Sequence, residues 1–479
     1  MTVLVIDAGT SSVRIALVAD GRVLDERRQP MSPSTPAPGL VEFDPRALTL
    51  TVIDLAVQAL ESWGPVDAVG IANQRASTVV WDRGTVDPVG PGLGWQDLRT
   101  IGECLTLAAD GIRLAPNHTA TKAAWLWDQI DPQRSRDLCI GTVDTWLTWC
   151  LTVGARHITD ATNASTTGLL AHDGTGWDDN VLAALRLDRR ALPEIVDSAG
   201  VIGEAVALPG APPIAGIAGD QQASLVGQRC TQPGQAKITF GTGGMLDVVV
   251  GSQRPSYAVR GGAGTFPLIA WQLGGEVTWG VEAIMLSAGS NVDWLRDDLG
   301  LIESSPSSHD VAASCPDTDG VWYVPALLGM GTPHWDYGAR GTLLGLTRGT
   351  GRAEVVRAVL EGVAHRGADL IEAAEADTGV SIDIVRVDGG MSANHTFVQA
   401  LANAAQRPVE LSPELEATAA GAGLLAELGV GDRPDLDGAA DTWEPIATVE
   451  PAGHARREEW HAAVERAKAW YPELTAIDF

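Results

Sequence analysis

Cysteine is scarce in this chain of 479 residues, and the cysteines it has are scattered. Cys104, Cys139, Cys150, Cys230 and Cys315 are odd in number and form no Cys-x-x-Cys pair. Disulfide frameworks and structural zinc sites need paired or closely spaced cysteines, so the sequence argues against both. The pattern is typical of a protein in a reducing cytosol.

Long apolar runs and a basic N-terminal stretch are also missing. No run of about 18 uninterrupted apolar residues occurs, and we therefore expect no membrane span and no membrane partner. The opening residues MTVLVIDAGTSS lack the basic start of a signal peptide. These two absences predict a cytoplasmic protein.

Positive charge is low, with 33 lysines and arginines against 61 acidic residues and a formal net charge of -28. Nucleic-acid binding requires basic surface, so we expect no nucleic-acid partner. The three lysines, Lys122, Lys237 and Lys468, each follow threonine or alanine. The Gly-Lys-Ser/Thr motif of P-loop nucleotide binders is therefore absent.

Two segments each have the pattern of a β-hairpin with a turn of glycine, threonine and serine. The first is TVLVIDAGTSSVRIALV at the start of the chain, and the second is KITFGTGGMLDVVVG, about 230 residues later. Backbone N–H groups in such turns can hold phosphate oxygens. Helical patterns at residues 48–63 and 352–376 complete a mixed composition, which predicts an α/β fold with two similarly built domains.

Asp220 stands in AGDQQASL, where an apolar strand ends and a helix begins. A carboxylate at the edge of an apolar core is costly unless it is paired or used, which favours a catalytic role. Aspartate is also a favoured N-cap residue, and the position alone is more typical of a helix cap than of a catalytic group. A Gly-x-Gly-x-x-Ala pattern at residues 421–426 lies within an alanine-rich helical stretch, and we interpret it as helix packing.

The order of the motifs resembles the FGGY family of carbohydrate kinases, and within it most closely the glycerol kinases. The resemblance covers residues 3 to about 430. The segments that carry it, in chain order, are VIDAGTSSVR, NQRAS, GWQDLRT, GTVDTWLTW, TDATNAS, GDQQASLVGQ, FGTGG, VPALLGMGTPHWD, GTLLGLTRGTGRAEVVRAVLE and VDGGMSAN.

This resemblance implies an α/β fold of two actin-like (ribonuclease H-like) domains with a catalytic cleft between them. Residues 1–228 would form the N-terminal domain, with the polyol or sugar site and the first phosphate hairpin. Residues 229–479 would form the C-terminal domain, with the nucleotide site and a C-terminal helix. The family also implies a possible homodimer or homotetramer.

The implied activity is ATP-dependent phosphorylation of a hydroxyl of a small polyol or sugar, with Mg²⁺. Asp220 would be the general base, and Asp7 would bind Mg²⁺, through water. Contacts to ATP are implied for the turn residues and for three later glycines and an asparagine. These nucleotide-binding positions are Thr10, Ser11, Ser12, Arg14, Thr242, Gly289, Gly389, Gly390 and Asn394.

The acceptor side departs from the glycerol kinases. Arg75, Trp95, Asp220 and Gln221 match their polyol-contacting positions. Three other positions differ, and these are Ala76 in place of glutamate, Asn117 in place of tyrosine and Met245 in place of phenylalanine. Polar sites discriminate strongly by the hydroxyls they bind, so we expect an acceptor of four to five carbons rather than glycerol.

Two alternatives stay open at this point. One is a true glycerol kinase with a substituted pocket, and the other is a catalytically weak sugar-sensing protein on the same fold. Lys122, in the same stretch as Asn117, is interpreted as a surface cation.

Overall fold

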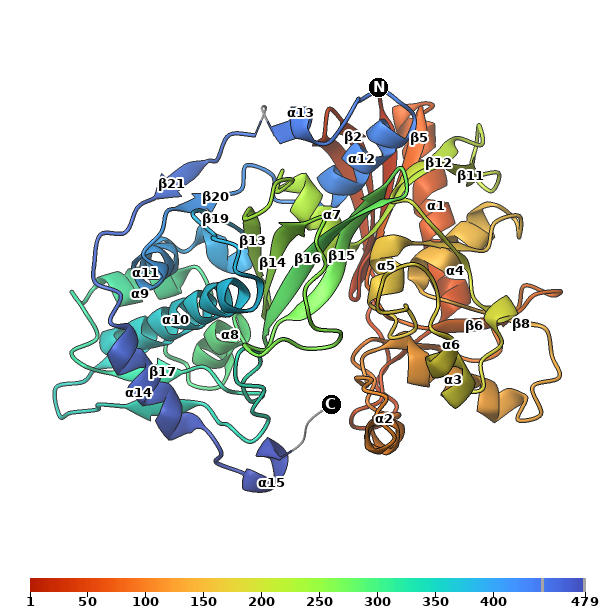
Figure 1. The fold of residues 1–479 in the computed structure, drawn as a ribbon. Coiled ribbons are helices and arrows are strands. Elements are labelled where there is room, and N and C mark those ends of the chain that lie inside the picture. The colour runs from red at the N-terminus through yellow and green to blue at the C-terminus, as the bar shows by residue number, and fades with distance from the viewer. Residues whose placement is uncertain (441–442, 477–479) are drawn as a thin grey trace.

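Two mixed β-sheets, each covered by helices, form the two halves of the protein in a computed structural model that describes residues 1–440 and 443–476 (Figure 1). In the first sheet, β1 pairs in parallel with β5 and antiparallel with β2. The strands of this sheet, in spatial order, are β11 (Ala199–Glu204), β12 (Pro213–Gly219), β5 (Ala68–Asn73), β1 (Val3–Ala8), β2 (Ser12–Ala19) and β3 (Arg22–Pro30).

The second sheet repeats this arrangement. Its hairpin β13–β14 is antiparallel, and β13 pairs in parallel with β19, as β1 does with β5. The strands, in spatial order, are β15 (Phe266–Leu273), β16 (Glu276–Met285), β14 (Gly244–Gly251), β13 (Ala236–Phe240), β19 (Val385–Asp388), β20 (Val409–Leu411) and β21 (Ala447–Val449). The expected pair of similarly built α/β halves, each opened by a hairpin, is confirmed.

Short two-stranded sheets complete the β-structure. They pair β4 (Glu42–Phe43) with β7 (Gly92–Leu93), β6 (Val79–Asp82) with β8 (Leu138–Gly141), β9 (Ile158–Asp160) with β10 (Glu194–Val196), and β17 (Trp322–Val324) with β18 (Thr342–Leu344).

The helices follow the expected apolar patterns. Asp44 caps α1 by accepting hydrogen bonds from the backbone of the first turn, and the buried face of α1 packs on the first sheet. Helices of the first half are α1 (Pro45–Trp63), α2 (Ile101–Ala109), α3 (Thr119–Ile130), α4 (Val143–Leu151), α5 (Ala161–Ser165), α6 (Asp179–Ala184), the 3₁₀ turn η1 (Arg189–Ala191) and α7 (Asp220–Gly227).

The longest helix of the second half, α10, packs its buried face against the core of the second sheet. The helices of this half are α8 (Ser290–Asp297), α9 (Ser307–Ala313), α10 (Arg352–Thr378), the 3₁₀ turn η2 (Gly390–Ala393), α11 (His395–Ala405), α12 (Ala417–Gly429), α13 (Asp437–Ala440), α14 (Arg457–Ala467) and α15 (Pro472–Thr475). The C-terminal helix that the family resemblance implies corresponds to α14.

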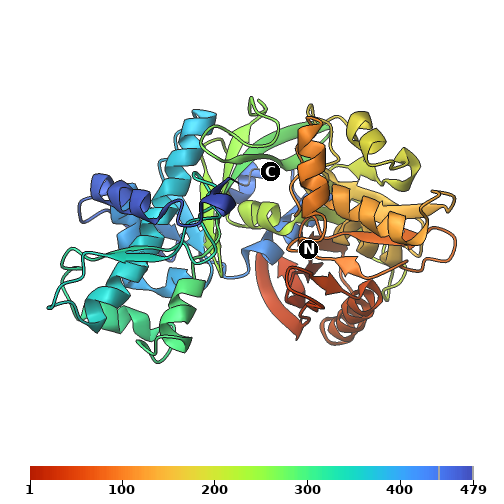
Figure 2. The same ribbon diagram turned by 90° about the horizontal axis from the view of Figure 1, so that it is seen from below.

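Helices α7 and α12 pack against each other where the two halves meet (Figure 2). Gly227 and Gly421 form the contact, because a Cβ at either position would lie 1.8 Å from a backbone oxygen of the other helix. Although α12 comes late in the chain, it also packs on β12, β5 and β1 of the first sheet. The interpretation of residues 421–426 as helix packing is therefore confirmed.

Within the part of the chain that the structure describes, no helix is both long enough and apolar enough to cross a membrane. The division of the chain at residues 228 and 229 stays a prediction.

Candidate active site

Asp220 lies where β12 ends and α7 begins, next to the junction of the two halves. Gly219 occupies the N-cap position of α7, and the helix has no side-chain cap. The Oδ1 atom of Asp220 instead accepts a hydrogen bond of 2.8 Å from the backbone N–H of Gln221. The capping alternative for Asp220 is therefore wrong. Burial raises the pKa of Asp220, although the nearby Arg75 guanidinium acts in the opposite direction.

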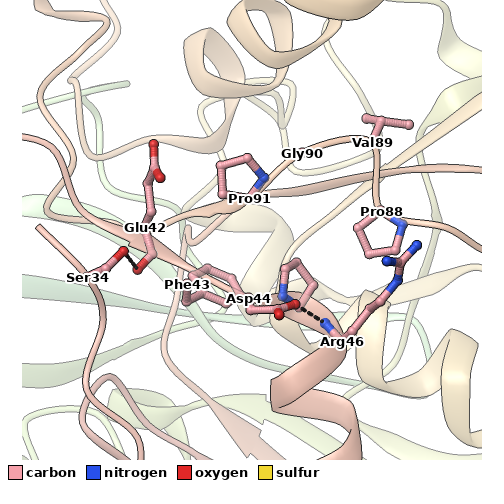
Figure 3. A pocket seen from close by; sticks show the side chains of 10 residues that line it. Ser34, Glu42, Phe43, Asp44, Arg46, Pro88, Val89, Gly90 and Pro91 are labelled. Carbon is pink, nitrogen blue, oxygen red and sulfur yellow. Dashed lines mark hydrogen bonds between the residues drawn. The ribbon is translucent and has the colours of Figure 1, made fainter. Parts of the chain in front are cut away.

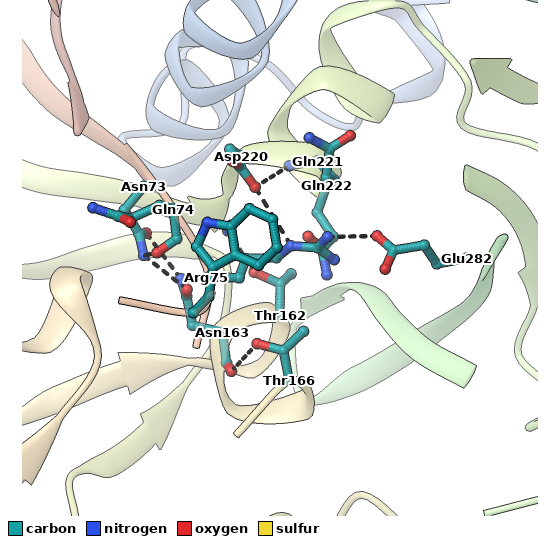
Figure 4. A network of polar contacts seen from close by, with 12 residues as sticks. Asn73, Gln74, Arg75, Thr162, Asn163, Thr166, Asp220, Gln221, Gln222 and Glu282 are labelled. Carbon is teal, nitrogen blue, oxygen red and sulfur yellow. Dashed lines mark hydrogen bonds and ion pairs between the residues drawn. The ribbon is translucent and has the colours of Figure 1, made fainter. Parts of the chain in front are cut away.

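Arg75 follows the end of β5 and lies between two carboxylates (Figure 4). Its Nε atom is 3.4 Å from Oδ1 of Asp220, and its Nη2 atom donates to Oε2 of Glu282 at 2.5 Å. Glu282 belongs to β16 of the second sheet, so this ion pair joins the two halves. Burial disfavours the guanidinium cation, but the two carboxylates outweigh burial and raise the pKa of Arg75.

A second buried ion pair lies directly beside this one. Asp247 on β14 is the cross-strand partner of Glu282, and the Nζ atom of Lys237 lies 2.8 Å from its carboxylate. The same Nζ atom donates to Oε1 of Gln221 at 2.6 Å. Two adjacent acids of the second sheet are thus neutralised, one by Lys237 of that sheet and the other by Arg75 of the first half.

The sequence motifs predict no role for Lys237, Asp247 or Glu282. A signal was present, because each charged side chain interrupts an otherwise apolar strand: KITF, MLDVVV and WGVEAIM. Charges at such positions must be paired in the fold, but the sequence does not say with which partner.

A polar network supports the backbone just before Asp220. Asp160 caps α5 by accepting from the backbone of Thr162 and Asn163. The Thr162 hydroxyl in turn accepts a 2.9 Å hydrogen bond from the N–H of Gly219. Asn163 and Asn73 exchange two amide hydrogen bonds (Figure 4), which fixes α5 to the end of β5.

At the first hairpin turn, a residue predicted to bind the acceptor substrate contacts a residue predicted to bind the ATP phosphates. Trp95 donates from Nε1 to the hydroxyl of Thr10 at 3.0 Å. The turn is closed by a hydrogen bond from the N–H of Gly9 to the carbonyl of Ser12, and Ser11 is exposed. Thr10 and Ser11 therefore stand at the outer end of the hairpin.

Asp7, at the end of β1, lies in a cluster of carboxylates. Burial is the main cause that raises its pKa to about 7; Arg14, at 3.3 Å, opposes this, and Asp220 and Glu416 reinforce it. Arg14 is shared with Glu416 and Glu26 as well. A hard oxygen ligand in this excess of negative charge fits a divalent cation such as Mg²⁺.

The second hairpin turn packs closely on Gly289. The N–H of Gly289 donates to the carbonyl of Gly241 at 2.9 Å, and a Cβ at Gly289 would lie 2.6 Å from that oxygen. Thr242 is exposed, and its carbonyl accepts from the N–H of Ala288. Gly289 is thus required by contact with this turn, and it places the start of α8 beside Thr242.

The DGG motif reaches both α7, through hydrogen bonds to the Asp388 carboxylate, and the second hairpin. A Cβ at Gly389 would lie 2.4 Å from the carbonyl oxygen of Phe240, whereas Gly390 has open space around it. Asn394 caps α11 and donates from its side chain to the hydroxyl of Ser308 at 2.9 Å. Gly390 is therefore the position of this motif that a ligand could approach closely.

The three departures on the acceptor side lie on separate elements. Ala76 is buried, and its carbonyl accepts from the Thr119 hydroxyl. Asn117 is exposed, and Met245 is half-buried on β14. Among the described residues, no hydrogen bond or ion pair joins Asn117 or Met245 to Asp220.

Two cavities lie away from these residues. One, of about 420 Å³, is lined by residues 34, 42–46 and 88–91 (Figure 3). The other, of about 540 Å³, lies among side chains of α9, α10 and α11. Neither is lined by a residue that the sequence predicts for the site.

The chain belongs to the FGGY family of carbohydrate kinases. The family's N-terminal domain matches residues 2–227, and its C-terminal domain matches residues 236–429. The expected α/β class with two domains is confirmed, and the enzyme is a phosphotransferase with an alcohol group as acceptor.

Among its relatives is the glycerol kinase of Alkalilimnicola ehrlichii, 40% identical over 492 residues and covering 98% of each chain. The glycerol kinase of Aromatoleum aromaticum is 41% identical and covers 98% of this chain and 99% of its own. Among solved structures, Plasmodium falciparum glycerol kinase with ADP superposes with a TM-score of 0.90 at 27% identity, covering 100% of this chain and 99% of its own. A xylulose kinase from Brucella ovis gives 0.86 at 25% identity, with both chains fully covered.

Lys122 is not the surface cation expected from the sequence. It is fully buried in α3, donates to the carbonyl of Asn117 at 2.9 Å, and burial lowers its pKa to about 7. An amine whose pKa is lower in the folded state than in the unfolded state binds fewer protons when folded. Burial of Lys122 therefore lowers the free energy of unfolding at low pH, and this loss becomes smaller as the pH rises from about 7 towards 10.

We predict that Lys122→Met removes this pH dependence. Between pH 7 and 9 the free energy of unfolding of the wild type should rise by about 2 kcal/mol relative to the variant. Urea unfolding at both pH values measures the difference. The partly exposed Lys468→Met is the control and should run parallel to the wild type; a difference between Lys122→Met and wild type that does not change with pH would contradict the prediction.

Proposed function

We propose that this kinase transfers the terminal phosphoryl group of ATP to a hydroxyl of a polyol or sugar of four to five carbons. The observation that carries the proposal is the position of Asp220. Its carboxylate contacts Arg75, which reaches Glu282 of the second half, and it interacts electrostatically with Asp7 beside the first phosphate turn. A base placed there can deprotonate an alcohol between an acceptor site and a phosphate site.

Asp220 acts as general base and takes the proton of the attacked hydroxyl. Its raised pKa, caused mainly by burial, makes the carboxylate a better proton acceptor than an exposed aspartate. Arg75, Trp95 and Gln221 hold the other hydroxyls of the acceptor. Gln221 is well suited to this because Lys237 fixes its Oε1 atom and leaves its amide N–H₂ to donate.

The substituted positions set the acceptor's size. Ala76 leaves space where a longer side chain would intrude, Asn117 offers a donor and an acceptor, and Met245 supplies an adaptable apolar wall. Hydrogen-bonding sites that lose their polar groups bind the original substrate poorly. The acceptor is therefore larger than glycerol.

ATP lies along the two hairpins and the DGG motif. The phosphates are held by Thr10, Ser11, Ser12, Arg14 and Thr242. The adenosine is bordered by Gly289, Gly389, Gly390 and Asn394. Asp7 holds Mg²⁺ through water, and when bound this ion offsets negative charge on the phosphate oxygens.

In the same proposal, residues 1–228 carry the acceptor site and residues 229–479 carry the nucleotide site. The protein works in the cytoplasm as a homodimer or homotetramer, with small molecules and neither nucleic acid nor membrane as its partners.

A second candidate is a true glycerol kinase, and one observation favours it. Relatives at 40 and 41% identity over almost the whole chain carry that name. A catalytically weak sugar sensor is less well supported, because Asp7, Thr10, Asp220 and Thr242 are all kept, and a binding protein has no chemical need for them.

The acceptor screen separates the first two candidates. Polyols and ketoses of three to six carbons are offered with MgATP, and ADP release is followed in a coupled assay. We expect a four- or five-carbon acceptor to exceed glycerol by at least about tenfold in kcat/KM. Glycerol as the best acceptor would instead identify a glycerol kinase, and hydrolysis without any acceptor dependence would argue against both.

The base is tested by Asp220→Asn. We expect the variant to fold as the wild type does and to lose about 10²–10⁴-fold in kcat, because the amide cannot accept the proton. Asp54→Asn, an exposed position on α1, is the matched control and should keep full activity. Near-normal turnover by Asp220→Asn would rule out the role.

A further inference from the structure

We propose that Glu282 is a positioning residue that holds the Arg75 guanidinium away from Asp220 and so leaves the Asp220 carboxylate free to take a proton. The proposal rests on the proposed function, since it takes Asp220 as the base. It goes beyond that function because Glu282 lies in the half opposite to Arg75 and is not among the residues proposed to bind either substrate.

The two carboxylates beside Arg75 lie at unequal distances from its guanidinium. Its side chain is 11% exposed and that of Glu282 is 10% exposed, so the guanidinium needs a carboxylate partner close by. Nη2 of Arg75 donates to Glu282 at 2.5 Å, whereas the ion pair with Asp220 joins Nε and Oδ1 at 3.4 Å (Figure 4). Glu282 is the near partner of the guanidinium, and Asp220 is the far one.

This inequality matters to proton transfer. An arginine that faces a carboxylate squarely donates two parallel hydrogen bonds and stabilises its ionised form. Such a carboxylate holds protons weakly and is a poor general base. If Glu282 did not hold Nη2, Asp220 would be the nearest remaining carboxylate for Arg75, and the guanidinium could turn to it.

The other charged groups around Asp220 cannot substitute for Glu282. Lys237 from β13 is committed to Asp247 of β14, to Gln221 and to Thr239. Asp7 from β1, whose pKa is raised by burial and further by the charge of Asp220, is paired with Arg14.

The remaining helix beside the base, α12, presents Thr418, whose hydroxyl contacts the backbone carbonyl of Asp220, and Glu416, which pairs with Arg14. Neither of these residues can draw the guanidinium of Arg75 away from Asp220. Among the described residues, Arg75 forms ion pairs with Asp220 and Glu282 alone.

The contact also joins the two halves of the chain. Arg75 follows β5 of the first sheet and Glu282 lies in β16 of the second, 207 positions along the chain, so Glu282 can hold the guanidinium only while the halves are together. Glu282 thus holds the Arg75 guanidinium away from Asp220 only when the two halves are together, which is also when the proposed acceptor and nucleotide sites lie side by side.

The test compares Glu282→Gln with Glu276→Gln, an exposed position on the same strand. The titration of Asp220 is followed by ¹³C NMR of protein labelled in its aspartate carboxyl groups, with the resonance assigned by its loss in Asp220→Asn. We expect the pKa of Asp220 to fall by about one unit or more in Glu282→Gln and to stay unchanged in Glu276→Gln. A pKa of Asp220 that is unchanged or higher in Glu282→Gln overturns the proposal.

Kinetics give a second, independent readout. For Glu282→Gln we expect kcat/KM for the acceptor to fall about ten- to hundredfold and its acid limb to move to lower pH, with the KM for ATP within about twofold of wild type. A loss of activity with an unmoved acid limb would indicate a merely structural role and would overturn the proposal.

Two further results complete the design. Should Glu282→Gln fail to fold, Glu282→Asp keeps the charge on a shorter side chain and is expected to shift the acid limb in the same direction by a smaller amount; no shift would again contradict the proposal. Should the wild type phosphorylate no acceptor at all, the proposed function fails, while the NMR titration still decides on Glu282.

Discussion

Burial of charge between the two sheets is the constraint on which the candidate site depends. Four charged side chains lie in largely apolar surroundings where the two halves meet: Arg75, Lys237, Asp247 and Glu282. None of them could stay ionised there without a partner of opposite charge. The four groups neutralise one another's charge in two adjacent ion pairs. One of these pairs, Arg75–Glu282, joins the first half to the second. The two halves must therefore be close enough for this ion pair to form.

The base profits from this arrangement. Asp220 lies at the beginning of α7, the hydrogen bond from Gly219 to Thr162 supports the backbone just before it, and its carboxylate is 3.4 Å from Nε of Arg75. A half-buried carboxylate that is not tightly paired keeps a raised pKa, which suits a general base. A general base needs a rigidly held backbone and a carboxylate that is only weakly paired with a cation.

The sequence predicted the parts of the fold that local chemistry determines. Glycine, threonine and serine turns between apolar runs identified both hairpins, and the alanine-rich segment around Gly421 identified a packed helix. It did not predict the partners of Glu282 or Lys237, because their pairing depends on strands brought together from distant parts of the chain. The prediction of Lys122 as a surface cation is wrong for the same reason. An amine near the start of a helix can face solvent or the core, and tertiary packing determines which of the two it does.

The central claim is that the acceptor's reacting hydroxyl lies at Asp220, between the two hairpin turns. A crystal structure with the preferred acceptor and a non-hydrolysable ATP analogue tests it most directly. The account predicts that hydroxyl within about 2.6–3.2 Å of the Asp220 carboxylate and on the side that faces the analogue's terminal phosphate. An acceptor bound elsewhere, or a hydroxyl directed away from Asp220, would contradict it.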